Sequence, residues 1–269
     1  MIIYDDGKSY RVVKQPDHGK QCAAFARSWG NEQFDFPTPA LSLELAAGEH
    51  DNGWTEWEQH PTIDERYARP WQFMELQAEE HVPLYRRGIA RSLDLDPYTA
   101  ILVSMHGTGL YNGRYGTFAG LKPKVFTAQQ QPIVDGYIAE QTGIQESLRE
   151  RLREQGEWDG ESSEARLWHN YRLLQILDRL SLWCCFQNLP TGKLGPTPTR
   201  LGQDDVDLEL TSARPWTLSM NPYPFREARV EAPVEARDVP KREYRSPEDF
   251  LEEFERARPY VAEFVLVPA

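Results

Sequence analysis

The sequence predicts a mainly helical protein with a small antiparallel β-sheet formed by its N- and C-terminal segments. In the middle of the chain, apolar residues recur with the 3.6-residue period of helices, whereas both ends carry short runs of β-branched and aromatic residues between turn signals. The chain has 269 residues, of which 40% are hydrophobic, and its 8 Trp, 12 Tyr and 11 Phe need a core to cover them. We therefore expect a single domain over residues 1–269.

The chain opens with the pattern of a β-hairpin. Residues 2–4 and 10–13 have strand-like composition, and an Asp-Gly turn signal lies between them. Two strands alone are marginally stable, so the hairpin needs partners. Three strand-like segments near the other end can supply them: residues 207–210, 216–220 and 263–267. The expected sheet thus joins residues 1–13 to residues 204–269.

Six segments between these ends are predicted to be helices that form a bundle over residues 14–188. The first begins near Pro16, where proline suits a first turn, and ends at Gly30. Residues 112–127, rich in Gly, Arg and Lys, are typical of a long loop, and residues 189–203, dense in Gly, Pro and Thr, of a connection to the sheet. The other five predicted helices cover residues 39–50, 71–93, 98–105, 135–155 and 162–188.

The charge and the termini exclude some classes of partner. The formal net charge is −12 and the isoelectric point about 5.1, so the field of the protein repels nucleic acids and anionic membranes. The first residues lack the basic and apolar regions of a signal peptide, and no stretch has the apolar length of a membrane helix. We expect a cytoplasmic protein without a nucleic-acid or membrane partner. Its three cysteines have no CxxC spacing, which favours reduced core residues over a structural zinc site.

Histidine and aspartate residues on helix faces form the strongest candidate site. His18 lies on the apolar face of the first predicted helix, and His50 is followed directly by Asp51 at the end of the second. Asp178 shares a face with leucines of the last helix, where a lone buried carboxylate is costly unless it is paired or metal-bound. Imidazole and carboxylate are ligands of first-row metals. A salt bridge to an arginine is the alternative for Asp178, and the company of the other three residues favours a metal.

The order of these four residues resembles the signature of the HD-domain superfamily of metal-dependent phosphohydrolases, in which a His on one helix precedes a His-Asp pair and a distant Asp. The local sequence His50-Asp51-Asn52-Gly53 is similar to the His-Asp-x-Gly often present in that superfamily. The whole chain also resembles an uncharacterised bacterial branch related to it, whose function is unknown. The resemblance implies an HD-like helical core over residues 14–188 and a mononuclear or dinuclear metal site.

The resemblance further implies a hydrolase that acts on a small phosphorylated metabolite or nucleotide. It would hold one or two divalent ions per chain, of Mn, Fe, Co, Ni, Zn or Mg, which activate water and stabilise charge on the phosphoryl group. Asp51 would bridge two ions and serve as the catalytic residue. Some members place two more histidines between the pair and the last Asp, and His81 and His106 hold that order here as further metal ligands. His81 could instead be a solvated helix residue, and His106 could cap a buried helix.

A phosphorylated substrate also needs cationic groups, and the predicted glycine-rich loop offers them. Arg114 and Lys122, with Lys124, are the candidates for substrate binding, and ordinary surface charge is the simpler interpretation of all three. His169 precedes Asp178 on the same predicted helix and is an alternative ligand. The alternative function is that of a non-catalytic metal-binding or ligand-sensing protein with a degenerate version of the same fold.

Overall fold

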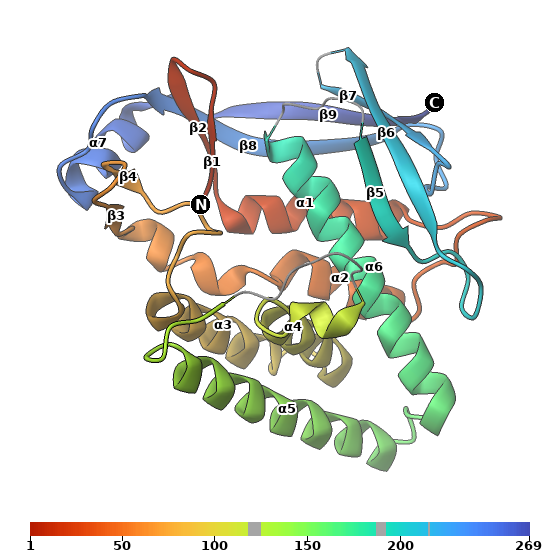
Figure 1. Ribbon diagram of the computed structural model, residues 1–269. Coiled ribbons are helices and arrows are strands. Elements are labelled where there is room, and N and C mark those ends of the chain that lie inside the picture. The colour runs from red at the N-terminus through yellow and green to blue at the C-terminus, as the bar shows by residue number, and fades with distance from the viewer. Residues whose placement is uncertain (118–124, 187–191, 215) are drawn as a thin grey trace.

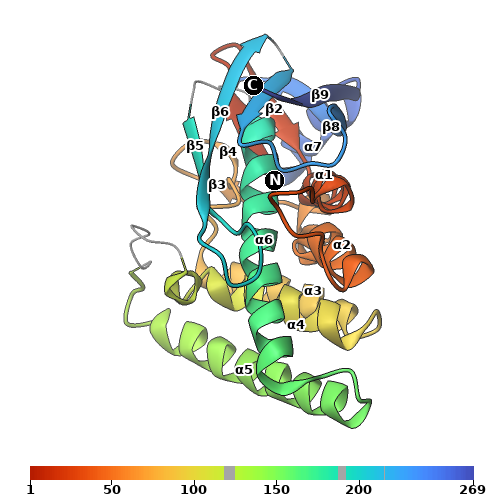
Figure 2. The same cartoon turned by 90° about the vertical axis from the view of Figure 1, so that its right-hand side faces the viewer.

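A computed structural model describes residues 1–117, 125–186, 192–214 and 216–269. A curled β-sheet lies on one side of a stack of helices, and α5 is the helix farthest from the sheet (Figure 1 and Figure 2). The long helix α6 runs from the end of α5, past the other helices, to the sheet. The helices are α1 (Gln15–Ser28), α2 (Ala40–Glu49), α3 (Ala78–Ser92), α4 (Pro97–Gly109), α5 (Gln131–Glu154), α6 (Gly160–Phe186) and α7 (Pro247–Arg256), with short helical turns η1 (Asn52–Trp54), η2 (Trp57–Gln59) and η3 (Gly113–Gly116).

The sheet has seven strands and joins both ends of the chain. Its strand order is β1-β2-β8-β9-β7-β6-β5. Neighbouring strands are antiparallel, except that β7 and β9 are parallel. The strands are β1 (Ile2–Asp5), β2 (Ser9–Val13), β5 (Gly192–Thr197), β6 (Val206–Arg214), β7 (Thr217–Asn221), β8 (Val230–Pro240) and β9 (Tyr260–Pro268), and a separate pair is formed by β3 (Ile63–Asp64) and β4 (Arg69–Pro70).

The predicted fold class, mainly helical with a small terminal sheet, is wrong because the sheet is large. The sequence analysis did not predict its longest strand, β8, which contains Pro233, and proline is depleted from strand interiors. The structure tolerates this proline because the part of β8 around it pairs with β9 alone, while β2 pairs only with Arg237–Pro240. Strand β5 was also missed, since it lies in the glycine- and proline-rich stretch that was predicted to be a connection.

The central helices follow the predicted pattern more closely. Each of the six predicted segments contains a helix, with ends that differ by a few residues. The largest difference is in the third segment, where residues 71–77 form turns and extended chain before α3 begins at Ala78. Helix α7 was not predicted, although Ser246 caps its start by accepting a hydrogen bond from the Asp249 amide (3.2 Å).

The helices and the sheet share a buried core. In α4, every residue from Tyr98 to Gly109 is buried, so this helix lies at the centre of the helical stack. A single apolar cluster includes Leu102 of α4, Leu177 of α6 and Leu266 of β9. All three cysteines are free and buried, as predicted. Among the described residues, no helix is both long enough and apolar enough to cross a membrane.

Candidate metal site

Four of the predicted ligands meet inside the helical stack. His18 comes from α1, His50 and Asp51 follow α2, and Asp178 comes from α6, and all four side chains are buried. His18 Nε2 lies 3.2 Å from Asp178 Oδ1, and His50 Nε2 lies 3.5 Å from Asp51 Oδ2 and 3.8 Å from Asp178 Oδ1. Ligands held tetrahedrally at about 2.1 Å from one ion lie about 3.4 Å apart, and these three pairs are close to that spacing. The groups whose ligand atoms all lie within 4.8 Å of one another are His18, Cys22 and His50, and His50, Asp51 and His106.

Close packing of α1 on α2 brings His18 near His50. A Cβ atom on Gly19 would lie 2.3 Å from the backbone oxygen of Gly48, so only glycine allows the two helices to approach this closely. The rings of His18 and His50 consequently lie edge to face, with their centroids 5.2 Å apart.

The hydrogen bonds around His18 set its tautomer. The Gln21 amide nitrogen donates to the Ala232 carbonyl (2.6 Å), which leaves the Gln21 oxygen as an acceptor for the Ser181 hydroxyl (2.7 Å). Since Ser181 has a single hydrogen to donate, its oxygen accepts from His18 Nδ1 at 2.7 Å. His18 Nε2 therefore presents a lone pair toward Asp178, which is the arrangement of a metal-binding histidine.

His50 is held in the same manner. Its Nδ1 lies 2.8 Å from the Ala47 carbonyl, which can only accept, so Nδ1 carries the hydrogen. Its Nε2 is buried and has no hydrogen-bond partner. A buried polar atom of this kind is costly unless another group satisfies it. The two imidazoles together direct two lone pairs at the carboxylates of Asp51 and Asp178.

The electrostatics of the cluster favour a bound cation. Burial alone would raise the pKa of Asp51, but in the protein without an ion a proton on His50 and the contact with His106 outweigh burial and hold that pKa below its usual range; a bound cation would take the place of that proton. At Asp178 burial again opposes ionisation, but in the protein without an ion the contact with a protonated His18 and the positive charge of a protonated His50 outweigh it and lower the pKa. Two ionised carboxylates with two imidazole nitrogens form a ligand set for a first-row divalent ion.

Cys22 belongs to the cluster, although the sequence analysis assigned it to the core. One turn after His18 on the same helix face, its Sγ lies 3.8 Å from His18 Nε2. The ligand atoms of His18, Cys22 and His50 lie within 4.8 Å of one another, so they could hold a metal. Burial raises the pKa of the Cys22 thiol well above its usual value, and the thiol donates to the Leu177 carbonyl (3.6 Å). The protonated sulfur is the weakest ligand of the set.

His106 and Tyr85 flank the other oxygen of Asp51. His106 Nε2 lies 3.6 Å from Asp51 Oδ1, and the ligand atoms of His50, Asp51 and His106 form a second group within 4.8 Å of one another. The Tyr85 hydroxyl donates to the same Oδ1 at 2.6 Å. The sequence offered no sign of this tyrosine, which α3 carries into the site. Burial lowers the pKa of His106 to about 4, so its imidazole is neutral at neutral pH.

Arg114 supplies the positive charge predicted for this region. Its guanidinium lies 3.5 Å from Asp178 Oδ2 and donates to His106 Nδ1 at 3.3 Å. Arg114 and Tyr115 have φ values of 55° and 54°, in the left-handed region that residues other than glycine rarely adopt. Such conformations cost roughly 1–2 kcal/mol per residue and cluster at functional sites. Lys122 and Lys124 lie outside the described residues.

An open cavity of about 190 Å³ adjoins the cluster, and Asp51, Asp178, His81, His106 and Arg114 all line it. His81 forms a hydrogen bond with the Tyr111 hydroxyl and packs edge-on against the Tyr85 ring, with the centroids 4.8 Å apart. It therefore lies at the cavity wall beside the aromatic side chains. Both histidines predicted as additional ligands thus face the same space.

His169, the alternative ligand, lies apart from this cluster. It is on α6 near Arg166 and Asp35, whose charges act on it, and burial lowers its pKa to about 4. Among the described contacts, none joins His169 to Asp178 or to the other three predicted ligands. Its environment is that of a buried, neutral core histidine.

The fold and the cluster define a protein of mixed helices and strands with a buried histidine–aspartate site that could hold a metal ion. The chain belongs to the family described as a protein of unknown function (DUF3891), whose model matches residues 1–241. No curated protein and no solved structure matches the chain. The predicted place in the HD-domain superfamily and its bacterial branch is therefore corrected, because the chain matches this other family and has a seven-stranded curled sheet instead of an HD helical domain.

Proposed function

We propose that this protein is a metal-dependent hydrolase of small phosphate esters, with a single divalent ion bound by His18, His50, Asp51 and Asp178. The observation that carries the proposal is the convergence of four buried ligand atoms beside an open cavity that also presents Arg114. A structural ion would need no cavity and no adjacent cation. A ligand set with an open side is typical of catalytic sites.

Each residue has a role that follows from its contacts. A divalent ion held by His18, His50, Asp51 and Asp178 would supply a water of lowered pKa as the nucleophile near neutral pH. Arg114 binds the phosphoryl oxygens through its guanidinium, which matches their geometry. His106 accepts from Arg114 and holds the guanidinium at the cavity. The water oxygen bonds to phosphorus, the ester P–O bond breaks, and the alcohol leaves with a proton.

The size of the cavity restricts the substrate. Its volume of about 190 Å³ is below the roughly 300–1,000 Å³ of pockets that enclose drug-sized ligands. We therefore favour a small phosphorylated metabolite over a nucleotide.

Elemental analysis and a substrate screen test the proposal. Tag-free protein, expressed with added Mn, Fe, Co, Ni, Zn or Mg, should retain close to one equivalent of a divalent ion after gel filtration. It should hydrolyse at least one small phosphomonoester, and a chelator should abolish turnover. A protein that stays metal-free in every medium contradicts the proposal, and stabilisation by phosphorylated ligands without turnover would indicate the non-catalytic alternative.

Arg114→Gln is expected to lower kcat/KM by at least tenfold, through a higher KM, without loss of the ion. The substitution removes a charge-assisted bond to phosphate worth about 1.5–3 kcal/mol, while Arg114 contacts the ligand Asp178 only at 3.5 Å. Arg86→Gln is the control, because Arg86 forms a surface ion pair with Glu140 (2.7 Å) and should leave both quantities unchanged. Metal content and steady-state kinetics measure the effect.

Tyr85→Phe is expected to raise the metal content from one ion to two. The Tyr85 hydroxyl occupies Asp51 Oδ1, and its removal frees that oxygen to act on a second ion together with His106, whose hydrogen would move from Nε2 to Nδ1 as Arg114 turns away. The variant should bind the second equivalent of Mn or Zn in a calorimetric titration. Two ions in the wild-type protein would show that Tyr85 does not limit the site to one.

A further inference from the structure

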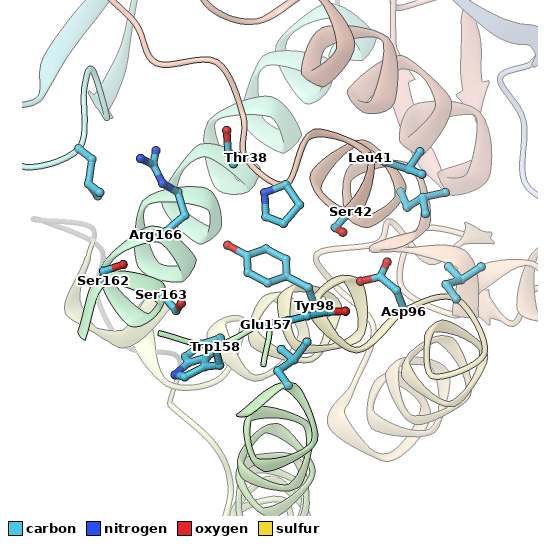
Figure 3. Close-up of a pocket in the computed structure, with 15 residues that line it drawn as sticks. Thr38, Leu41, Ser42, Asp96, Tyr98, Glu157, Trp158, Ser162, Ser163 and Arg166 are labelled. Carbon is cyan, nitrogen blue, oxygen red and sulfur yellow. The ribbon is translucent and has the colours of Figure 1, made fainter. Parts of the chain in front are cut away.

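A second and larger cavity lies away from the metal site. It has a volume of about 660 Å³ and shares no lining residue with the smaller cavity. It is formed where α2, α4 and α6 begin and where α5 ends, and Figure 3 shows its lining side chains. Its volume is within the range of pockets that enclose a drug-sized molecule.

Most of the lining is apolar. Leucines from four segments and the rings of Tyr98 and Trp158 surround the space. Leu41 and Leu95 are 66% and 46% exposed, which is unusual for large apolar side chains that lie together. A ligand with an apolar body would cover both of them.

Hydrogen-bond donors gather at one side of the cavity. Figure 3 shows the Tyr98 hydroxyl on the side of Arg166, Ser162 and Ser163. The Tyr98 oxygen already accepts from Asn170 Nδ2 (2.8 Å), so its hydrogen is left for another acceptor. Tyr98 is 8% exposed, and burial raises its pKa well above the usual value of a phenol, which keeps the phenol protonated.

Arg166 is the only cationic side chain of the described lining. It places Nη1 3.2 Å from Asp35 Oδ2, and no described contact engages its other nitrogens. Asp96 lies on the opposite side of Tyr98, where it caps α4 by accepting from the Thr99 amide (3.0 Å). The charges therefore orient an anion toward Arg166 and away from Asp96.

We propose that this cavity binds a small-molecule monocarboxylate with an apolar body, whose carboxylate meets Arg166 and the Tyr98 hydroxyl. The planar guanidinium pairs well with a carboxylate. A phosphate is disfavoured, because its second charge would face Asp96 and the exposed Glu157 with one cation to balance them. The leucines at the other side contact the apolar body.

Calorimetric titration with 4-phenylbutyrate tests the proposal, with 4-phenylbutanamide and 4-phenylbutylamine as neutral and cationic analogues of the same shape. The acid should bind at least tenfold more tightly than the amide, and the amine should not bind. Leu45→Trp, which fills the cavity from α2, should abolish binding of both the acid and the amide while the protein keeps its melting temperature within a few degrees.

Arg166→Gln should weaken binding of the acid at least tenfold and leave the affinity for the amide unchanged. Arg172→Gln is the matched control, since Arg172 is on the same helix, is equally exposed at 28%, and is likewise paired with an aspartate, Asp205. It should leave acid binding intact. Equal affinity for the acid, amide and amine, binding that survives Leu45→Trp, or no binding of the acid at millimolar concentration would each overturn the proposal.

Discussion

Replacement of Asp178 by asparagine is expected to remove the ion and the activity, and to lower the stability of the protein more in the presence of metal than with chelator. Asparagine keeps the shape of the side chain but not its charge. Without a cation, the surrounding imidazoles hold the pKa of Asp178 below its usual range and Arg114 lies 3.5 Å away, so the carboxylate stabilises the fold at neutral pH and its neutralisation costs part of that stability. With metal at a hundredfold excess over Kd, the wild type gains about 2.7 kcal/mol and the variant does not. Melting temperatures with metal and with chelator measure both effects.

Asp64→Asn provides the matched control. Asp64 is also fully buried, is bound by Arg66 at 2.7 Å, and lies outside the site. Its substitution should lower the melting temperature equally with metal and with chelator. If Asp178→Asn behaves in the same way, Asp178 is a structural partner of His18 and Arg114, and the proposed ion has no place between them.

Gly19→Ala is expected to destabilise the protein by at least 2 kcal/mol and to weaken metal binding. The added Cβ would lie 2.3 Å from the Gly48 oxygen, a backbone atom that can move away only if α1 and α2 separate. Overpacking of this kind typically costs 1–3 kcal/mol. Separation of the helices also moves His18 away from His50. Urea denaturation and metal titration give the two values.

The same substitution elsewhere should have the opposite sign. Gly143 is within α5, and a Cβ there meets nothing within 4 Å. Gly143→Ala should therefore stabilise the protein by about 0.5–1 kcal/mol, because alanine loses less backbone entropy in a helix. Destabilisation by both substitutions, to a similar extent, would contradict the role assigned to the α1–α2 contact.

Local patterns in the sequence were sufficient to find the six central helices and four of the residues that meet in the cluster. A histidine or an aspartate on an apolar helix face is visible as a departure from the 3.6-residue pattern, as at His18 and Asp178. The structure brings them together with His50 and Asp51. That they bind a metal remains a prediction.

Features that depend on contacts between distant segments could not be predicted. Tyr85 reaches Asp51 because η1 packs against α3, and no local pattern reports that packing. The extent of the sheet was missed for a related reason, since β8 forms by pairing with β2 and β9, and Pro233 is tolerated only because that part of β8 pairs with β9 alone. A chain whose central sequence predicts helices can still fold around a large sheet that its two ends form.

Three helices begin at the larger cavity and carry side chains to the histidine–aspartate cluster. From Ser42 on α2 to His50 directly after it, and from Tyr98 to His106 on α4, the distance along the helix axis is about 12 Å, at 1.5 Å per residue. On α6, Arg166 at the cavity precedes Asp178 of the cluster by about three turns. A molecule that spreads the helix starts also alters the ligand spacing, and an ion that fixes the spacing resists the spread. If binding in the cavity changes the affinity of the proposed ion, linkage requires that the ion change the affinity of the cavity by the same factor.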